Sequence, residues 1–309
     1  MRAYLKTRSA PFSVRRWQMW TMRLLTVVMM ALPLALPVAS VGAQGVLVAP
    51  TALVLTESRR SATVTLVNTS STASDVSIAL AFGYPETDSL GQMRLVLQDA
   101  PADSMPSAVP LLSVYPSRVL LPPGATRVVR LVATAPLPTA HEHWARLVVT
   151  SRAAAGTAAS TAGANGTDST QASLDPSPEV ALSLEVRSIL GVFYRPSQAT
   201  TSLVASAPET KLHEGKLNAR LTLKREGSAA YVGTLRAVLR DSLGVARGEA
   251  QVPLGVYYEL SPSVSFDMAR LPQGKYAVEW RATTDRADVP STLLTPGAVV
   301  QASTDVRVP

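Results

Sequence analysis

No cysteine occurs anywhere in the 309 residues. This absence excludes disulfide bonds, thiolate nucleophiles, thiolate metal ligands and the acylated cysteine of a lipoprotein. The sequence also lacks the Gly-x-Ser-x-Gly turn of a serine hydrolase and any phosphate-binding glycine loop. We therefore expect no enzyme activity and no cofactor.

A strongly basic mature chain is lacking as well, although the formal net charge is +7. Of the 29 Lys and Arg residues, six lie in residues 1–43, which hold no acidic residue, so 23 basic residues stand against 22 acidic ones in the remainder. Binding to nucleic acid requires a persistent basic face. This balance disfavours a nucleic-acid partner.

The N-terminal stretch has the three parts of a secretory signal peptide. A basic region ends at Arg23, an apolar run follows from Leu24 to Pro37, and small residues precede Gln44. The run is shorter than the roughly 20 apolar residues that span a membrane. We expect residues 1–43 to be cleaved and the mature chain to be periplasmic. Three methionines are candidate starts: Met1, Met19 and Met22.

Short segments of alternating apolar and polar residues recur through the rest of the chain. Ala62, Val64 and Leu66 alternate with threonines, and Tyr276, Val278 and Trp280 share one face of a later segment. No stretch shows sustained helical periodicity. The sequence predicts an all-β fold of two immunoglobulin-like β-sandwich domains, at 44–196 and 197–309.

Residues 113–131 hold two apolar segments separated by Pro122-Pro123-Gly124. Proline fixes φ and glycine accepts positive φ, so this tripeptide forces a turn. The segment is therefore either a hairpin or a corner at which the chain changes sheets.

Residues 153–178 contain no large apolar residue apart from Leu174. Such a segment cannot bury enough apolar area to offset the entropy lost on ordering. It is either a linker between domains or a disordered loop inside the first domain. In the second case an alternating row forms that domain's last strand: Val180, Leu182, Leu184 and Val186.

Three pieces of the first domain occur in a characteristic order and spacing: Tyr115–Arg130, Glu142–Leu147, and a strand ending in Phe193-Tyr194-Arg195-Pro196. Over about residues 46–196 the chain resembles the PapD-like periplasmic chaperones of pilus assembly. The resemblance implies two immunoglobulin-like domains, and it places the loop at 153–178 inside the first of them.

In that family the last strand of the first domain lends alternate apolar side chains to an incomplete fibre subunit, a form of β-augmentation. The resemblance implies that Val180, Leu182, Leu184 and Val186 are the donor residues. It also implies pilus-like or other surface-fibre subunits as partners, with delivery to an outer-membrane assembly platform. Two alternatives remain: a dimer that caps its own donor edge, and a structural or adhesive envelope protein without chaperone activity.

The resemblance breaks at the two cations with which the family grips the subunit's C-terminal carboxylate. Those positions fall near Thr51 or Ala52 and on Gly191, none of which carries charge. Three arginines are the remaining candidates for the cleft: Arg187, Arg195 and Arg130.

His141 and His143 flank Glu142 and would share one face of a strand, as pairs of metal ligands do. The sequence places no third ligand beside them. We expect no metal site, and interpret these residues as the polar start of the strand that contains Trp144.

Overall fold

The computed structural model describes residues 45–98, 101–154, 184–269 and 271–308. Within these ranges the regular structure consists of strands and two short 3-10 helices, so the predicted all-β class is confirmed. The expected signal peptide, Val180, Leu182 and nearly all of the loop at 153–178 lie outside the described residues. In the ranges described, no helix is long and apolar enough to cross a membrane.

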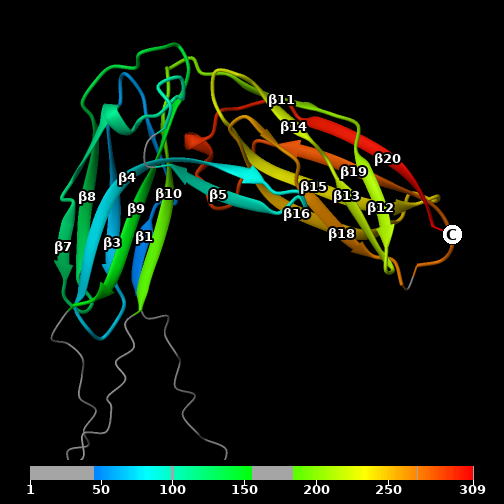
Figure 1. Cartoon of the computed structure of the whole chain (residues 1–309), viewed down its shortest axis with the longest axis horizontal. Coiled ribbons are helices and arrows are strands. Elements are labelled where there is room, and N and C mark those ends of the chain that lie inside the picture. The colour runs from blue at the N-terminus through cyan, green and yellow to red at the C-terminus, as the bar shows by residue number, and fades with distance from the viewer. Residues whose placement is uncertain (1–44, 99–100, 155–183, 270, 309) are drawn as a thin grey trace, which may run out of the picture. The chain divides into compact units, whose positions relative to one another are not determined.

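The first sandwich packs two sheets face to face (Figure 1). One has the order β1-β3-β8-β6, with β1 (Val46–Ala49), β3 (Ser61–Asn68), β8 (Thr126–Ala133) and β6 (Leu112–Tyr115). The other has the order β2-β10-β9-β4-β5, with β7 also paired to β4. Its strands are β2 (Ala52–Leu55), β10 (Glu185–Tyr194), β9 (His143–Ala153), β4 (Ser74–Thr87), β5 (Met93–Gln98) and β7 (Arg118–Leu121). The 3-10 helix η1 (Val109–Leu111) precedes β6.

The chain changes sheets at two prolines of this sandwich. Before Pro50 it forms β1 against β3, and after Pro50 it forms β2 in parallel register with β10. Likewise β6 lies in the first sheet and, after Pro116, β7 lies in the second. A ladder position needs a backbone N–H that proline lacks, so pairing stops there. The segment 113–131 is thus a sheet-changing corner, and Gly124 at φ 69° turns the chain back into β8.

Apolar side chains from both sheets fill the first core, including Leu66, Leu131 and Leu147, each with no exposed surface. Tyr194 near the end of β10 lies in this core and its hydroxyl donates to the Ala135 carbonyl at 3.1 Å. The alternation in β3 therefore has the physical basis that the sequence indicated, because Val64 and Leu66 lie in this core.

The second sandwich contains three sheets in the residues described. The first two have the orders β11-β14-β17 and β12-β13-β18, and the third has the order β16-β15-β19-β20. The strands are β11 (Thr201–Ala205), β12 (Glu209–His213), β13 (Lys216–Arg220), β14 (Leu223–Gly227), β15 (Tyr231–Asp241), β16 (Ala246–Val256), β17 (Glu259–Leu260), β18 (Ser263–Asp267), β19 (Gly274–Thr283) and β20 (Val300–Val308), with the 3-10 helix η2 (Ser291–Leu293). Tyr276, Val278 and Trp280 point into its core, as the alternation predicted.

β4 is long because its first part and its last part pair with different strands. Up to Ala81 it pairs with β9, and from Phe82 it pairs with β5 alone, so residues 82–98 form a two-stranded ribbon that we call the arm. Figure 1 shows the two cyan strands leaving the first sandwich together. At the tip of the arm, the carbonyl of Gly91 accepts from the Ser263 N–H at 3.2 Å. The sequence analysis did not predict this ribbon.

Candidate functional site

One edge of β10 is partly unpaired. β9 pairs along the whole of β10, whereas β2 pairs only with its last four residues, Gly191–Tyr194. Within the described part of the chain, no strand covers the other edge of residues 185–190. Backbone N–H and C=O groups along such an edge are a template for an added strand.

Apolar side chains accompany this free edge. Leu184, just before β10, is 69% exposed and Val186 is 38% exposed. Strand alternation places both on the face of Leu190, which is buried in the first core. This face is therefore continuous with the core but open to solvent at its outer end.

A pocket of about 430 Å³ lies where the free edge stops. There β2 begins, and Ala52 lies opposite Gly191 in parallel register. The two uncharged positions that the sequence analysis identified in the cleft are therefore neighbours, and both line this pocket. The second strand and the last strand of the first sandwich meet at this point.

Arg146 on β9 supplies a cation to the same pocket. It is paired with Gly191 along the edge of β10 that faces β9, whereas Ala52 is paired along the other edge. Only 9% of the surface of Arg146 is exposed. Its Nε donates to the Gly83 carbonyl at 3.0 Å, and its guanidinium carbon lies 4.9 Å from the ring centre of Tyr257. Among the described residues, no carboxylate lies within ion-pair distance of this guanidinium. The sequence analysis missed Arg146, although it follows Trp144 in one of the three family motifs.

None of the three arginines expected in the cleft lines this pocket. Arg187 is exposed on β10, and its Nη2 forms an ion pair at 3.7 Å with Oε1 of Glu185 on the same strand. Arg130 is exposed on β8, in the opposite sheet, with Ser61 as its hydrogen-bond partner. Arg195 is buried but is occupied by an internal ion pair, described next.

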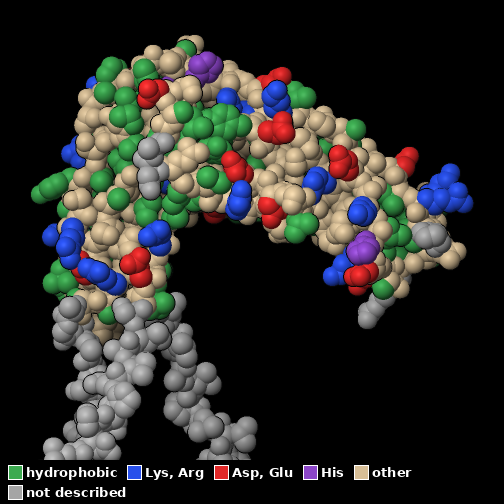
Figure 2. Space-filling view, viewed as in Figure 1, with side chains coloured by type: hydrophobic (Ala, Val, Ile, Leu, Met, Phe, Trp, Pro, Cys, Tyr) green, Lys and Arg blue, Asp and Glu red, His purple; other side chains and the backbone are tan. Residues whose placement is uncertain are grey.

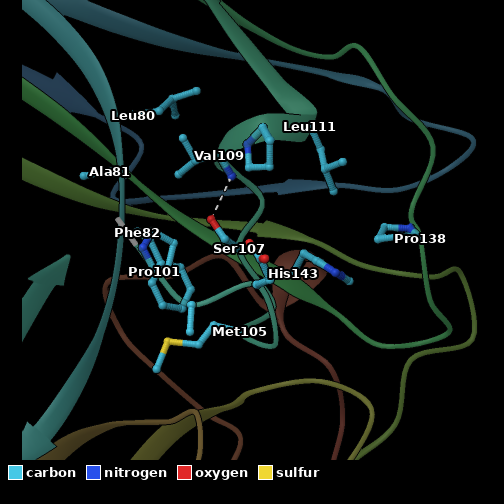
Figure 3. A pocket seen from close by; sticks show the side chains of 13 residues that line it. Leu80, Ala81, Phe82, Pro101, Met105, Ser107, Val109, Leu111, Pro138 and His143 are labelled. Atoms are coloured by element: carbon cyan, nitrogen blue, oxygen red, sulfur yellow. Dashed lines mark hydrogen bonds between the residues drawn. The ribbon is translucent and has the colours of Figure 1, made fainter. Parts of the chain in front are cut away.

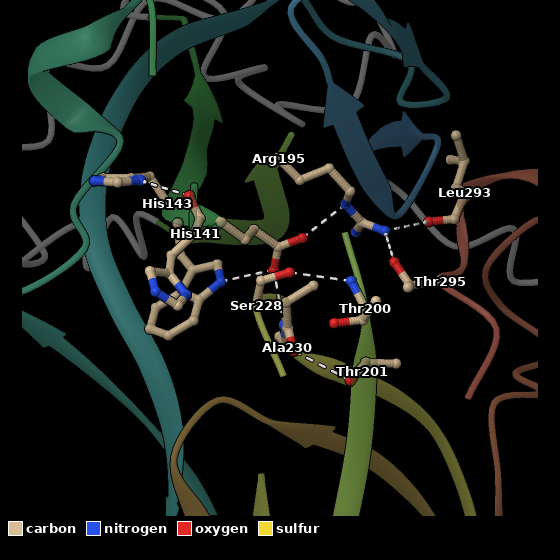
Figure 4. A network of polar contacts seen from close by, with 12 residues as sticks. His141, His143, Arg195, Thr200, Thr201, Ser228, Ala230, Leu293 and Thr295 are labelled. Carbon is tan, nitrogen blue, oxygen red and sulfur yellow. Dashed lines mark hydrogen bonds and ion pairs between the residues drawn. The ribbon is translucent and has the colours of Figure 1, made fainter. Parts of the chain in front are cut away.

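Glu142 is buried and lies at the centre of a polar network that links the two sandwiches. Figure 4 shows its partners Arg195 and Ala230. One carboxylate oxygen lies 2.6 Å from Nε of Arg195, and the other accepts from Trp144 Nε1 at 2.7 Å and from the Ala230 N–H at 3.0 Å. Arg195 also donates to the Leu293 carbonyl and to Thr295. Burial raises the pKa of Glu142, and the cation and hydrogen bonds oppose that shift. The sequence suggested that Glu142 belongs to the polar start of the strand that contains Trp144. In the structure Glu142 is buried, and its role is structural.

Aromatic rings pack beside this network. Trp144 makes edge-to-face contacts with Tyr257 at 4.7 Å and with Tyr258 at 5.3 Å between ring centres. The guanidinium carbon of Arg225 lies 5.7 Å from the ring centre of Trp144. Trp144 is thus a core residue, but of the contact between the sandwiches and not of the first sandwich alone.

Charged residues alternate across the outer face of the sheet that contains β10. Glu185, Arg152 and Asp75 are directly opposite one another on β10, β9 and β4. Arg118 on β7 adds an ion pair to Asp75 at 2.6 Å. Its hydrogen bond lowers the pKa of Asp75 to about 2, with Arg152 adding to the shift against the opposing effect of burial. Figure 2 shows acidic and basic side chains gathered together at this end of the first sandwich.

A separate pocket of about 510 Å³ lies between β4 and the segment before β6 (Figure 3). Phe82, Met105 and Val109 give it an apolar lining, and His143 lies at its side. Nδ1 of His143 is 3.1 Å from the His141 carbonyl, and burial lowers the pKa of the His143 ring. In the residues that can be described, no group of three His, Cys, Asp or Glu side chains is placed to hold a metal ion.

No family model matches the sequence, and no curated protein matches it. Solved structures do match. The chain is similar to the CupB2 chaperone of Pseudomonas aeruginosa (18% identity, TM-score 0.36, covering 85% of this chain and 100% of that chain) and to the E. coli chaperone DraB (16%, 0.38, 84% and 98%). It is also similar to a chain of the CsuC–CsuE chaperone–tip adhesion subunit pre-assembly complex of Acinetobacter baumannii (11%, 0.42, 84% and 98%). The names of all three structures include a chaperone.

Proposed function

We propose that this chain is an exported, non-enzymatic chaperone that holds pilus-like or other fibre subunits by lending them β10, and delivers them for assembly at the outer membrane. The observation that carries the proposal is the free edge of residues 185–190, which ends at the Arg146 pocket. An added strand from the client would gain backbone hydrogen bonds along this edge, while Leu184 and Val186 fill the groove of the incomplete client subunit.

The geometry also gives the added strand a direction. β2 occupies the edge from Gly191 onward, so a strand on residues 185–190 would abut the start of β2. Arg146 at that end suits a terminal carboxylate, because the Asp288 carboxylate that also lines the pocket is paired with Arg286 at 2.7 Å. A client strand with its C-terminus beside Arg146 runs parallel to β10, in line with β2.

Arg146 thereby takes the place of the two missing family anchors. It reaches the same point from the neighbouring strand β9, through the space that the absent side chain of Gly191 leaves. A buried guanidinium without a carboxylate partner is unfavourable on its own, so a bound carboxylate would stabilise it.

The first test is co-purification of the tagged mature chain from the periplasm of its native host, followed by mass spectrometry. We expect a small β-rich subunit that is lost with Leu184→Glu and retained with Leu243→Glu, a matched change at an 84% exposed leucine of the second sandwich. A chain that carries no subunit, or is found only in surface fibres, would instead indicate a structural envelope protein.

The second test uses a decapeptide of alternating polar and apolar residues with either a free or an amidated C-terminus. The wild-type chain should bind the free acid about 10- to 100-fold more tightly, the range expected for a charge-assisted hydrogen bond. Arg146→Gln should abolish this preference, and Arg281→Gln on an exposed face of the second sandwich should not. Equal affinity of the wild-type chain for acid and amide would exclude Arg146 as the anchor.

A further inference from the structure

The Arg146 pocket has walls from three sources. β9 and β10 provide Arg146 and Ile189, and the second sandwich provides Val232. The third wall is the arm, which contributes Met93 and Leu95. The apolar residues of this wall are part of the pocket that holds the cation.

The second sandwich, and not the first, holds the far end of the arm. Beyond Ala81 no pairing of β4 with β9 continues in the part of the chain described. At the tip, the Gly91 carbonyl accepts from the Ser263 N–H, and Thr87 Oγ1 accepts from the Ser261 N–H at 2.9 Å. A Cβ added to Gly91 would lie 2.5 Å from the Ser263 Cβ, which shows how closely the tip is seated.

We propose that the arm is the specificity element of the site: its wall selects clients whose last residue carries a large apolar side chain. This inference rests on the proposed function, because it assumes that a client carboxylate binds Arg146. With the carboxylate on Arg146, the terminal side chain lies in the same pocket, where Met93, Leu95 and Ile189 offer apolar contact. The second sandwich acts by holding this wall in place.

The probes are two decapeptides that differ only in a C-terminal Phe or Ala, both with a free carboxylate. The wild-type chain should bind the Phe peptide about tenfold more tightly, the scale of discrimination that an apolar pocket achieves. Leu95→Trp fills the pocket and should abolish this preference. Leu90→Trp, a change at an exposed leucine on the arm's tip outside the pocket, should leave the preference intact.

A second variant acts at the tip, away from the pocket. Gly91→Val collides with Ser263 and should weaken the preference for Phe, whereas Gly244→Val, at another positive-φ glycine with open space around it, should not. Wild-type binding of both peptides with equal affinity would overturn the role of the arm and leave the chaperone function standing. A wild-type chain that binds neither peptide and carries no subunit would overturn both.

Discussion

Nη1 of Arg146 lies 3.3 Å from the point where a Cβ on Gly191 would stand. The missing side chain on β10 and the buried cation on β9 are therefore parts of one arrangement. A side chain at position 191 would crowd the guanidinium, which would have to shift by a few tenths of an ångström.

Gly191→Lys tests this relationship directly. The new side chain would crowd both Arg146 and the Phe193 ring, whose nearest atom lies 3.1 Å from the added Cβ. We expect binding of the carboxylate decapeptide to weaken by about tenfold, since a displaced charged contact contributes about 1.5–3 kcal/mol. Fluorescence titration measures this. Tighter binding would mean that a lysine here anchors the client independently of Arg146.

Glu142→Gln should destabilise the whole chain. It leaves the Arg195 guanidinium buried without its carboxylate, a change that typically costs about 3–5 kcal/mol. Urea unfolding measures the free energy. The matched control is Glu249→Gln, which removes an exposed pair with Arg236 and should cost far less stability, because solvent screens that pair. Similar losses for both variants would show that the Glu142–Arg195 pair does not hold the sandwiches together.

Stability should fall as the pH drops below the ordinary pKa of histidine, because of His143. Burial lowers the pKa of His143 in the folded state, so below about pH 6.5 the unfolded chain binds a proton that the folded chain does not. The stability that the neutral His143 ring allows is fully present above about pH 6.5. It is lost as the pH falls from there to the lower pKa of the folded state. Thermal melts of the wild type and His143→Gln between pH 7.5 and 5 isolate it. A constant difference in Tm would contradict the prediction.

Asp75→Asn tests a loss of stability in the same direction but at lower pH. The pKa of Asp75 is lowered to about 2, so its ion pairs contribute fully above its ordinary pKa and are lost as the pH falls toward 2. The exposed arginine partners limit the contribution to about 1 kcal/mol or less. Urea unfolding at pH 7 and pH 2.5 should show the difference between wild type and variant shrinking at the lower pH. A difference that persists unchanged would assign the effect to packing.

The sequence predicted the strands whose partners impose a clean alternation, such as β3 and β19, because one buried face leaves its mark at every second residue. It could not predict Arg146 as a cleft residue, since its neighbours Gly191 and Ala52 are distant in the chain. Nor could it predict the burial of Glu142, which depends on Arg195 and on a backbone N–H of the second sandwich. The arm could not be predicted for a related reason. Met93–Gln98 alternates like any edge strand, and the sequence around it does not indicate that the tip of the arm contacts Ser263.

The change of sheet at Pro50 has a consequence for how a client would be aligned. Because β2 takes over the edge of β10 at Gly191, residues 185–190 form an open slot in the part of the chain that the structure describes. This slot has a closed end at β2. A client strand in this slot would be positioned by contact of its C-terminus with the closed end. The position of the client's last residue, and not the match of side chains along the strand, would then set the register, which makes β2 a molecular ruler.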